Sequence, residues 1–154
     1  MGRGASSGGS ASPAALGLVG QWRARLRFRG GDFAATDDLE FMYVFNLGGT
    51  MTESSNYDGA PPVPPAYGIW RQVGPSRFEA RYEFYPTQAP AGRGDSTTGG
   101  GWLPAGRGVF SEVITVSDDG ETFTSTIRYE ALDRAGLPIE GGGDGSGRGV
   151  RLRF

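Results

Sequence analysis

Between residues 22 and 29 the chain alternates at every position between an apolar residue and an arginine. The apolar residues are Trp22, Ala24, Leu26 and Phe28. Successive side chains of an extended strand point to opposite faces, so a period of two places all four on one face. A helix would scatter them around its circumference. The segment is therefore predicted to be a strand with one buried and one solvated face.

The same period of two recurs along the rest of the chain. It covers the segments 39–46, 78–85, 109–117, 122–129 and 150–154. Turn-forming residues separate these segments, among them Gly48-Gly49, which leads into a short strand over 50–54, and the segments 118–120 and 133–136. No helical stripe is present, and only a short turn is expected between Asp32 and Asp38. The pattern predicts an all-β domain of about eight short antiparallel strands.

Strands joined in this order can close into a barrel or pack as a two-sheet sandwich. Closure is favoured because it removes the exposed strand edges. Nine Phe, six Tyr and three Trp can fill a small barrel or line a cavity for one small ligand. We therefore predict a single domain over 18–154, an eight-stranded antiparallel up-and-down β-barrel. A disordered tail rich in Gly, Ser and Ala is predicted over 1–17.

Three segments interrupt the alternation. The Pro-rich segment 58–65 is predicted to be a rigid loop at the barrel mouth rather than a Pro-rich ligand for a partner domain. The segment 86–108 is a long Gly-rich loop whose Trp102 either closes over a ligand or packs on the barrel rim. The Gly-rich segment 141–149 is predicted to be a flexible link before the last strand.

The composition excludes several kinds of chemistry. The chain has no His and no Cys, so a Cys/His zinc site, a Ser–His or Cys–His dyad and a disulfide cannot form. Fifteen basic residues, all Arg, face 17 acidic ones and give a formal net charge of −2. This balance argues against nucleic acid or an anionic membrane as a partner. We expect no cofactor and no metal.

The sequence carries no membrane or export signal of the usual kind. No stretch approaches the ~18 apolar residues of a membrane-spanning helix, and the segment 14–20 is too short and glycine-broken for a signal peptide. We expect a soluble cytoplasmic protein. The 28 Gly and the use of Arg in place of Lys indicate a GC-rich, actinomycete-like genome.

Several motifs resemble those of lipocalins and of bacterial lipocalin-like (calycin) proteins. Gly20-Gln21-Trp22 is similar to the lipocalin Gly-x-Trp, and Arg151 or Arg153 lies where lipocalins carry an Arg that packs on this Trp. The segments 45–50, 65–70 and 73–78 resemble successive motifs of the bacterial proteins. The resemblance spans Leu18 to Phe154. It implies an eight-stranded barrel that holds an apolar or aromatic small molecule, and similar bacterial barrels include cofactor-free cyclases.

Two carboxyl groups are candidates for the barrel interior. If Phe110, Ile114 and Val116 point inward, Glu112 points inward with them. The opposite parity places Val109, Ser111, Val113 and Thr115 inside and Glu112 in water; hydrophobicity favours the first. Glu53, beside Met51, has the same ambiguity. A carboxyl in an apolar barrel has a raised pKa and can act as acid, base or hydrogen-bond anchor.

Aromatic residues complete the candidate site. Tyr43, Tyr82 and Tyr129 fall on the apolar faces of their strands and could hold a carbonyl or hydroxyl of a ligand. The commoner arrangement, in which such tyrosines reach solvent at a barrel end, is favoured. Phe110, Trp70 and Trp102 are further candidates for ligand contact. Trp22 is interpreted as a structural plug, on the lipocalin resemblance.

The Arg row of 23–29 is interpreted as a solvated outer face. Cross-strand ion pairs are expected with Glu40, Glu79 and Glu83 on neighbouring strands.

Three hypotheses for function follow. The first is a binding module that encloses one apolar or aromatic small molecule, of natural-product type, against Phe and Trp faces. The second is a cofactor-free cyclase or isomerase that orders a polyketide or polyene in the same cavity, with Glu112 and Tyr43 as catalytic residues. Whether the chain is an enzyme stays open. The third is an assembly role through the loops, and a homodimer is compatible with the sequence.

Overall fold

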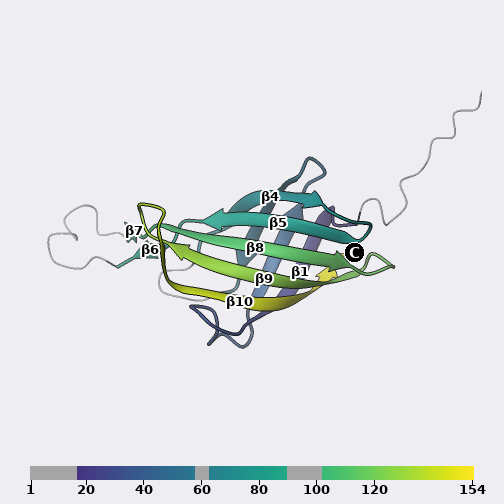
Figure 1. The fold of residues 1–154 in the computed structure, drawn as a ribbon. Helices are drawn as coiled ribbons and strands as arrows, with labels where there is room; N and C mark the ends of the chain where they lie inside the picture. The colour runs from purple at the N-terminus through teal and green to yellow at the C-terminus, as the bar shows by residue number, and fades with distance from the viewer. Residues whose placement is uncertain (1–16, 58–62, 90–101) are drawn as a thin grey trace, which may run out of the picture.

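The structure is a computed structural model that describes residues 17–57, 63–89 and 102–154, in which eight strands close into a barrel (Figure 1). The barrel strands are β1 (Gly20–Phe28), β2 (Glu40–Phe45), β3 (Thr50–Ser55), β4 (Ala66–Gln72), β5 (Arg77–Phe84), β8 (Arg107–Val116), β9 (Thr122–Leu132) and β10 (Pro138–Arg151). Two short strands, β6 (Thr87–Gln88) and β7 (Leu103–Pro104), pair outside the barrel. Within the described residues, no helix is long and apolar enough to cross a bilayer.

The strand order around the barrel is β1-β10-β9-β8-β5-β4-β3-β2, and every neighbouring pair is antiparallel. The predicted all-β, eight-stranded up-and-down barrel is therefore confirmed. The tail prediction falls almost wholly on residues 1–16, which lie outside the described residues. The expected turn between Asp32 and Asp38 is present, as a loop between β1 and β2.

The period of two in the sequence becomes the inside and outside of the barrel. In β1 the four apolar residues are buried and the arginines between them are exposed. The same alternation holds along β2, β5 and β9. The inward side chains form one continuous apolar core. The predicted Gly48-Gly49 turn joins β2 to β3, and Gly49 adopts a φ of 88°, which favours glycine.

The Gly-rich segment 141–149 lies in the middle of β10, so the prediction of a flexible link is wrong. Gly145, Gly147 and Gly149 occupy inward positions where the barrel is crowded. A Cβ on Gly149 would lie 2.1 Å from the Phe123 ring, and one on Gly147 would lie 2.6 Å from Ser125 Oγ. These glycines let β10 approach bulky neighbours; the lack of a side chain serves close packing here rather than flexibility.

The inward positions of these glycines also correct the strand predicted over 150–154. Because Gly145, Gly147 and Gly149 point inward, Val150 and Leu152 point outward and are 55 % and 46 % exposed. β10 ends at Arg151, whereas the alternation predicted a strand to the last residue.

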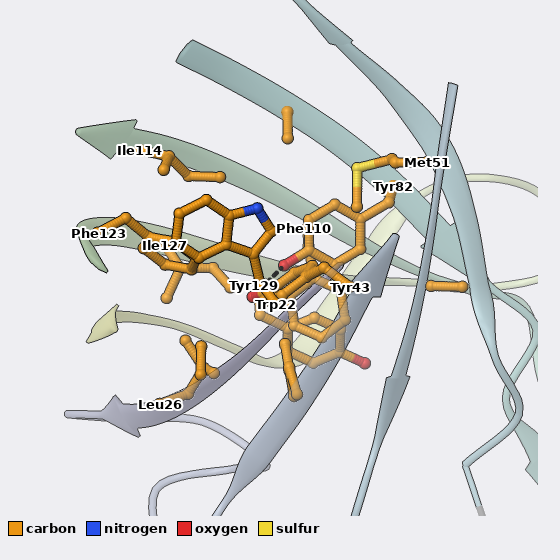
Figure 2. Close-up of a cluster of buried hydrophobic side chains, with 14 of the residues drawn as sticks. Trp22, Leu26, Tyr43, Met51, Tyr82, Phe110, Ile114, Phe123, Ile127 and Tyr129 are labelled. Atoms are coloured by element: carbon orange, nitrogen blue, oxygen red, sulfur yellow. Dashed lines mark hydrogen bonds between the residues drawn. The ribbon is translucent and has the colours of Figure 1, made fainter. Parts of the chain in front are cut away.

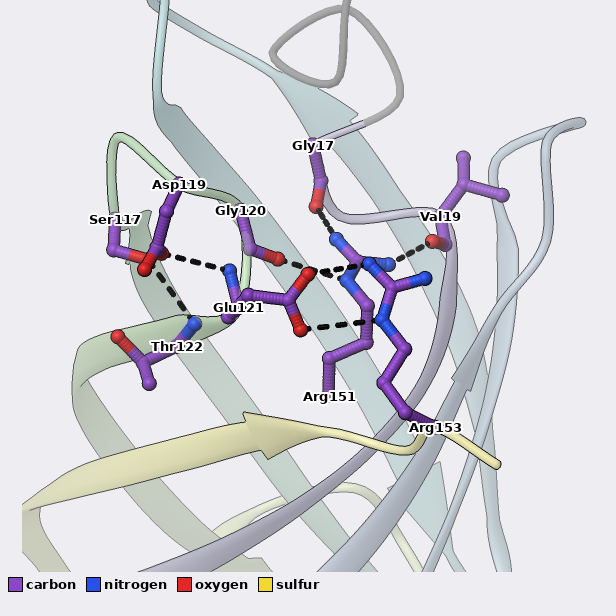
Figure 3. Close-up of polar contacts among 9 residues, drawn as sticks. All are labelled: Gly17, Val19, Ser117, Asp119, Gly120, Glu121, Thr122, Arg151 and Arg153. Carbon is purple, nitrogen blue, oxygen red and sulfur yellow. Dashed lines mark hydrogen bonds and ion pairs between the residues drawn. The ribbon is translucent and has the colours of Figure 1, made fainter.

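Arg151 and Trp22 pack together at one end of the barrel; Figure 3 shows the polar contacts of Arg151. The Arg151 guanidinium lies 4.2 Å from the centroid of the Trp22 ring. It donates hydrogen bonds to the carbonyl oxygens of Val19 (2.6 Å), Gly120 (2.8 Å) and Gly17. One side chain thus ties the chain before β1 to the turn before β9. The packing of Arg151 on Trp22 is what the lipocalin resemblance implied for Arg151 or Arg153.

The neighbouring contacts complete this end. Trp22 Nε1 donates to the carbonyl of Leu18 at 2.9 Å, and its ring packs on Phe123. Arg153 instead forms an exposed ion pair with Glu121. The interpretation of Trp22 as a structural plug agrees with these contacts.

The outer Arg row forms ion pairs, although only partly with the predicted partners. Arg25 pairs with Glu40 (3.3 Å), and Arg27 pairs with Asp37 (2.8 Å). The predicted pairing with Glu79 and Glu83 is wrong, because both lie on β5, whose neighbours are β4 and β8 rather than β1. Glu79 pairs with Arg71 of β4, and Glu83 pairs with Arg81 and Arg107.

The two long loops are described only at their edges. Residues 58–62 and 90–101 lie outside the described residues, and with them most of the Pro-rich and Gly-rich segments. Val63, at the end of the Pro-rich segment, packs against the core. The segment 86–108 is not wholly loop, since it contains β6, β7 and the start of β8.

Adding one methyl group at Gly149 should destabilise the fold. Gly149→Ala would place its Cβ against the buried Phe123 ring, and such overpacking costs about 1–3 kcal/mol. The matched control is Ser146→Ala, at an exposed position of the same strand. Urea denaturation gives both free energies of unfolding. Equal stability of Gly149→Ala and the wild type would contradict the packing argument.

Replacing Arg151 by Lys should also destabilise the protein. The three carbonyl contacts and the stacking on Trp22 need a planar, forked donor, so we expect a loss of about 1–3 kcal/mol. Arg153→Lys, which keeps the charge at an exposed ion pair, should cost clearly less. Thermal unfolding of the two variants tests the order, and a larger loss for Arg153→Lys would reverse the assignment.

Candidate functional site

Glu112 lies inside the barrel. Phe110, Ile114 and Val116 are buried with it, and only 1 % of Glu112 is exposed. The favoured parity of this strand is confirmed; of the alternative inward set, Val109 is the one residue that is also buried. The register of β8 places Glu112 between Ala80 of β5 and Ile127 of β9, both apolar.

Two tyrosine hydroxyls hold one oxygen of this carboxyl group. Tyr82 donates to Glu112 Oε2 at 2.7 Å and Tyr43 donates to the same atom at 3.0 Å. The two hydroxyl oxygens are 3.4 Å apart and meet in the middle of the buried cluster (Figure 2). The expectation that the tyrosines reach solvent at a barrel end is wrong for Tyr43 and Tyr82, because both hydroxyls are used inside.

A second carboxyl group faces the same interior. Glu53 pairs across the sheet with Tyr43 and is 3 % exposed. Glu53 Oε1, Glu112 Oε1 and Ser125 Oγ are buried and have no hydrogen-bond partner. We name Tyr43, Glu53, Tyr82, Glu112 and Ser125 the interior polar cluster. Sequence reasoning missed Ser125, although it was a polar residue on the apolar face of its strand.

Burial dominates the electrostatics of the interior polar cluster. It raises the pKa of Glu112, and the hydroxyls of Ser125, Tyr82 and Tyr43 oppose the rise. The Ser125 hydroxyl therefore lies near the carboxyl group without forming a hydrogen bond of good geometry. Burial and then the charge of Glu112 raise the pKa of Glu53 to about 8. Near neutral pH Glu53 therefore holds a proton, and the pKa values of Tyr43 and Tyr82, raised first by burial, keep both phenols neutral.

Since Glu112 Oε2 accepts both tyrosine hydrogen bonds, a proton on this carboxyl group belongs on Oε1. That oxygen is the one without a partner. The geometry thus leaves Glu112 with one anchored oxygen and one oxygen free to donate or accept.

Aromatic rings surround the interior polar cluster. Tyr43 stacks on Phe45 with ring centroids 5.3 Å apart, and Tyr82 stacks on Phe110 at 5.1 Å. Phe110, a predicted ligand contact, touches rings from five other parts of the core: Phe28, Phe33, Phe41, Phe84 and Tyr129. The site therefore offers polar groups embedded among flat apolar faces.

The end of the barrel opposite Arg151 is closed by a side chain from the loop between β1 and β2. Phe33 packs on Tyr129 (4.8 Å between centroids), Tyr57 (5.2 Å) and Phe28 (5.4 Å). Burial, followed by the charges of Asp32 and Tyr57, raises the pKa of Tyr129 to about 12. Tyr129 thus lies at this end rather than in the interior polar cluster. The sequence signal that could have shown Phe33 is one large apolar residue within a polar loop.

The other two predicted aromatic contacts lie elsewhere. Trp70 Nε1 donates to the carbonyls of Asn46 (3.0 Å) and Thr50 (3.2 Å), so this side chain packs on the turn between β2 and β3. Trp102 lies just before β7 and is 47 % exposed. Neither is brought to the interior polar cluster.

Side chains fill the barrel interior in this conformation. Trp22, Phe41, Phe45 and Phe110 are each less than 2 % exposed. A groove of about 620 Å³ is lined mainly by outward side chains such as Arg29, Ile69 and Arg128. A ligand that reaches the interior polar cluster must therefore displace side chains at one end.

Within the described residues, no group of three carboxylates is placed to hold a metal ion. No protein-family model and no curated protein matches the sequence. The closed antiparallel barrel is compatible with the calycin-like fold that the motifs suggested.

The stability of the protein should fall as the pH rises through neutrality. Because the pKa of Glu53 is raised from 4.5 to about 8, the folded chain binds more protons than the unfolded chain between these values. The contribution of Glu53 is complete below pH 4.5 and lost as the pH passes 8; its slope reaches at most ~1.4 kcal/mol per pH unit. The pKa of Glu112, which burial also raises, changes the stability in the same direction.

Glu53→Gln should therefore flatten this slope. Urea denaturation at several pH values between 4.5 and 8 measures the slope of stability against pH. The control is Glu130→Gln, which removes an exposed carboxyl group of β9 and should keep the wild-type slope. An unchanged slope in Glu53→Gln would contradict the assignment.

Proposed function

We propose that the barrel binds one small molecule with an apolar or aromatic body, whose polar group reaches the interior polar cluster. The observation that carries this proposal is the set of three buried atoms without partners, Glu53 Oε1, Glu112 Oε1 and Ser125 Oγ. Buried polar atoms are nearly always paired, and leaving one unpaired costs about 1–3 kcal/mol. A ligand that bonds to these atoms would recover that free energy.

A purely structural role explains the cluster less well. Apolar side chains of similar volume at buried polar positions are often neutral or stabilising. The neighbours of Glu112 on both sides, Ala80 and Ile127, are themselves apolar. Two carboxyl groups at such positions lower the stability of the free protein. Binding of a polar ligand group would explain why they occupy these positions.

Access is easiest at the Phe33 end. The loop that carries Phe33 is outside the strand ladders, and its backbone is held by few bonds, such as Asp32 N to Gly141 O (2.8 Å) and Ala34 N to Gly31 O (3.2 Å). Segments of this kind open at lower free energy than paired strands. The Arg151 end is tied by three carbonyl contacts.

Native mass spectrometry of the freshly purified protein tests the proposal directly. We expect a stoichiometric adduct of small-molecule size, which denaturation releases for identification. For protein purified without ligand, an uncharged apolar dye such as Nile red and a panel of aromatic compounds should raise the melting temperature. A clean mass together with no shift from any compound would refute ligand binding.

Phe33→Ala should speed ligand access. Removing the ring opens the contacts with Tyr129, Tyr57 and Phe28, so the association rate of Nile red should rise several-fold. Stopped-flow fluorescence measures this rate. Phe154→Ala, at a fully exposed position, should leave it unchanged. An unchanged rate in Phe33→Ala would place access elsewhere.

A second function is favoured by one observation, the carboxyl group of Glu112 between two tyrosine hydroxyls. This carboxyl group can donate a proton from Oε1 to a bound ligand, and Tyr43 can stabilise the negative charge that remains on Glu112. In a cofactor-free cyclase or isomerase the barrel would supply ordering and exclusion of water. Turnover lost in Glu112→Gln and Tyr43→Phe, with ligand binding retained, would support this second function; unchanged turnover would exclude these roles.

A further inference from the structure

The three unpartnered atoms of the interior polar cluster share one chemical property: all can accept a hydrogen bond. Glu53 Oε1 and Glu112 Oε1 are carboxyl oxygens, and Ser125 Oγ is a hydroxyl oxygen. They come from β3, β8 and β9, so they approach the interior from different walls. Tyr43 and Tyr82 already donate to Glu112 Oε2, which leaves these three positions open.

The described part of the interior contains acids and no base. The interior polar cluster supplies two carboxyl groups and three hydroxyl groups, and no arginine of the described residues is buried. The arginines of β1 point outward, and the guanidinium of Arg151 is held at the closed end by carbonyl oxygens. Within the described residues, no side chain therefore supplies a positive charge that would complement the two carboxyl groups.

The surrounding rings suit the apolar body of a ligand. Tyr43 stacks on Phe45, and Tyr82 stacks on Phe110, next to the hydroxyl groups that hold Glu112. Carboxyl oxygens surrounded by apolar rings are complementary to a cationic amine with an apolar body.

We propose that the ligand carries a primary ammonium group, which donates its three N–H bonds to Glu53 Oε1, Glu112 Oε1 and Ser125 Oγ. This inference rests on the proposed function and specifies the ligand class for the same site. The number of donors on a primary ammonium equals the number of open acceptors. A ligand with a neutral hydroxyl group would offer one donor to these three acceptors, and one with a carbonyl group would offer none.

Binding of an ammonium group should change the number of protons that the protein holds. The titratable groups that face Glu53 are Glu112, Tyr43 and Tyr82, and the two phenols stay neutral. In the free protein near pH 7 Glu53 holds a proton, because its pKa is raised to about 8, and the pKa of Glu112 is raised as well. An ammonium group favours the carboxylate form, so binding should release protons, and affinity should rise between about pH 6 and pH 8.

Matched ligand pairs test the inference on the full chain. The pairs share an apolar body and differ in the end group: 2-phenylethylamine and 2-phenylethanol, tryptamine and tryptophol, octylamine and octanol. Isothermal titration calorimetry gives each Kd, and repeating it in buffers of different ionisation enthalpy gives the protons released. In at least one pair the amine should bind more than about tenfold tighter, the scale of a charge-assisted hydrogen bond.

Two variants locate the effect. Glu53→Gln, which keeps the size of the side chain, should abolish most of the preference for the amine and the proton release. Glu130→Gln on the outer face should keep both. Circular dichroism and the affinity for Nile red show whether each variant still folds and binds.

The outcomes separate the two proposals. If alcohols or Nile red bind and no amine is preferred, the ammonium inference is wrong and the proposed function stands. If the amine is preferred equally in Glu53→Gln, its site is elsewhere and the inference is also wrong. If no compound binds and no native adduct is found, the proposed function fails and the inference fails with it.

Discussion

The pairing of β1 with β10 is the contact on which the structure depends, because it closes the barrel. Without it, β1 and β10 would each leave a strand edge in solvent. Closure requires β10 to pass next to Phe123 and Leu26, and glycine at 147 and 149 makes this approach sterically feasible. Arg151, directly after these glycines, then bonds to carbonyls on both sides of the junction. A segment that looks flexible in sequence thus determines the most demanding packing of the fold.

Closure also decides the chemistry of the interior. Once every strand has two neighbours, an inward carboxyl group cannot turn to water, and its proton affinity rises. Glu112 meets this constraint with two tyrosine hydrogen bonds on one oxygen, whereas Glu53 Oε1 has none. The two groups therefore differ: two hydrogen bonds fix the orientation of Glu112, whereas no hydrogen bond holds Glu53 Oε1.

The sequence predicted the elements whose two faces differ. Alternation in β1, β2, β5 and β9 identified strands and faces correctly, and the apolar residues of β8 indicated the inward position of Glu112, since burial follows a period of two. It failed where glycine carries no hydropathy signal, in β10, and where pairing depends on topology, as for Glu79 and Glu83. The interior polar cluster was predicted in part: Tyr43, Glu53, Tyr82 and Glu112 were candidates individually. The convergence of the Tyr43 and Tyr82 hydroxyls on Glu112 Oε2, and the buried position of Ser125 near it, depend on barrel geometry that no local pattern contains.

The two ends of the barrel are held by different interactions, so the interior is not equivalent when it is approached from one end or the other. At the Arg151 end, charged hydrogen bonds to backbone carbonyls and a cation–π contact join separate segments. At the other end the closure is a Phe33 side chain on a loop, held mainly by contacts between rings. Ring contacts of this kind can be exchanged for similar contacts with a ligand at little net cost, whereas charged hydrogen bonds to buried carbonyls cannot. The interior polar cluster lies between an end held by charged hydrogen bonds and an end held by ring contacts, an arrangement compatible with the proposed entry of a ligand from one side.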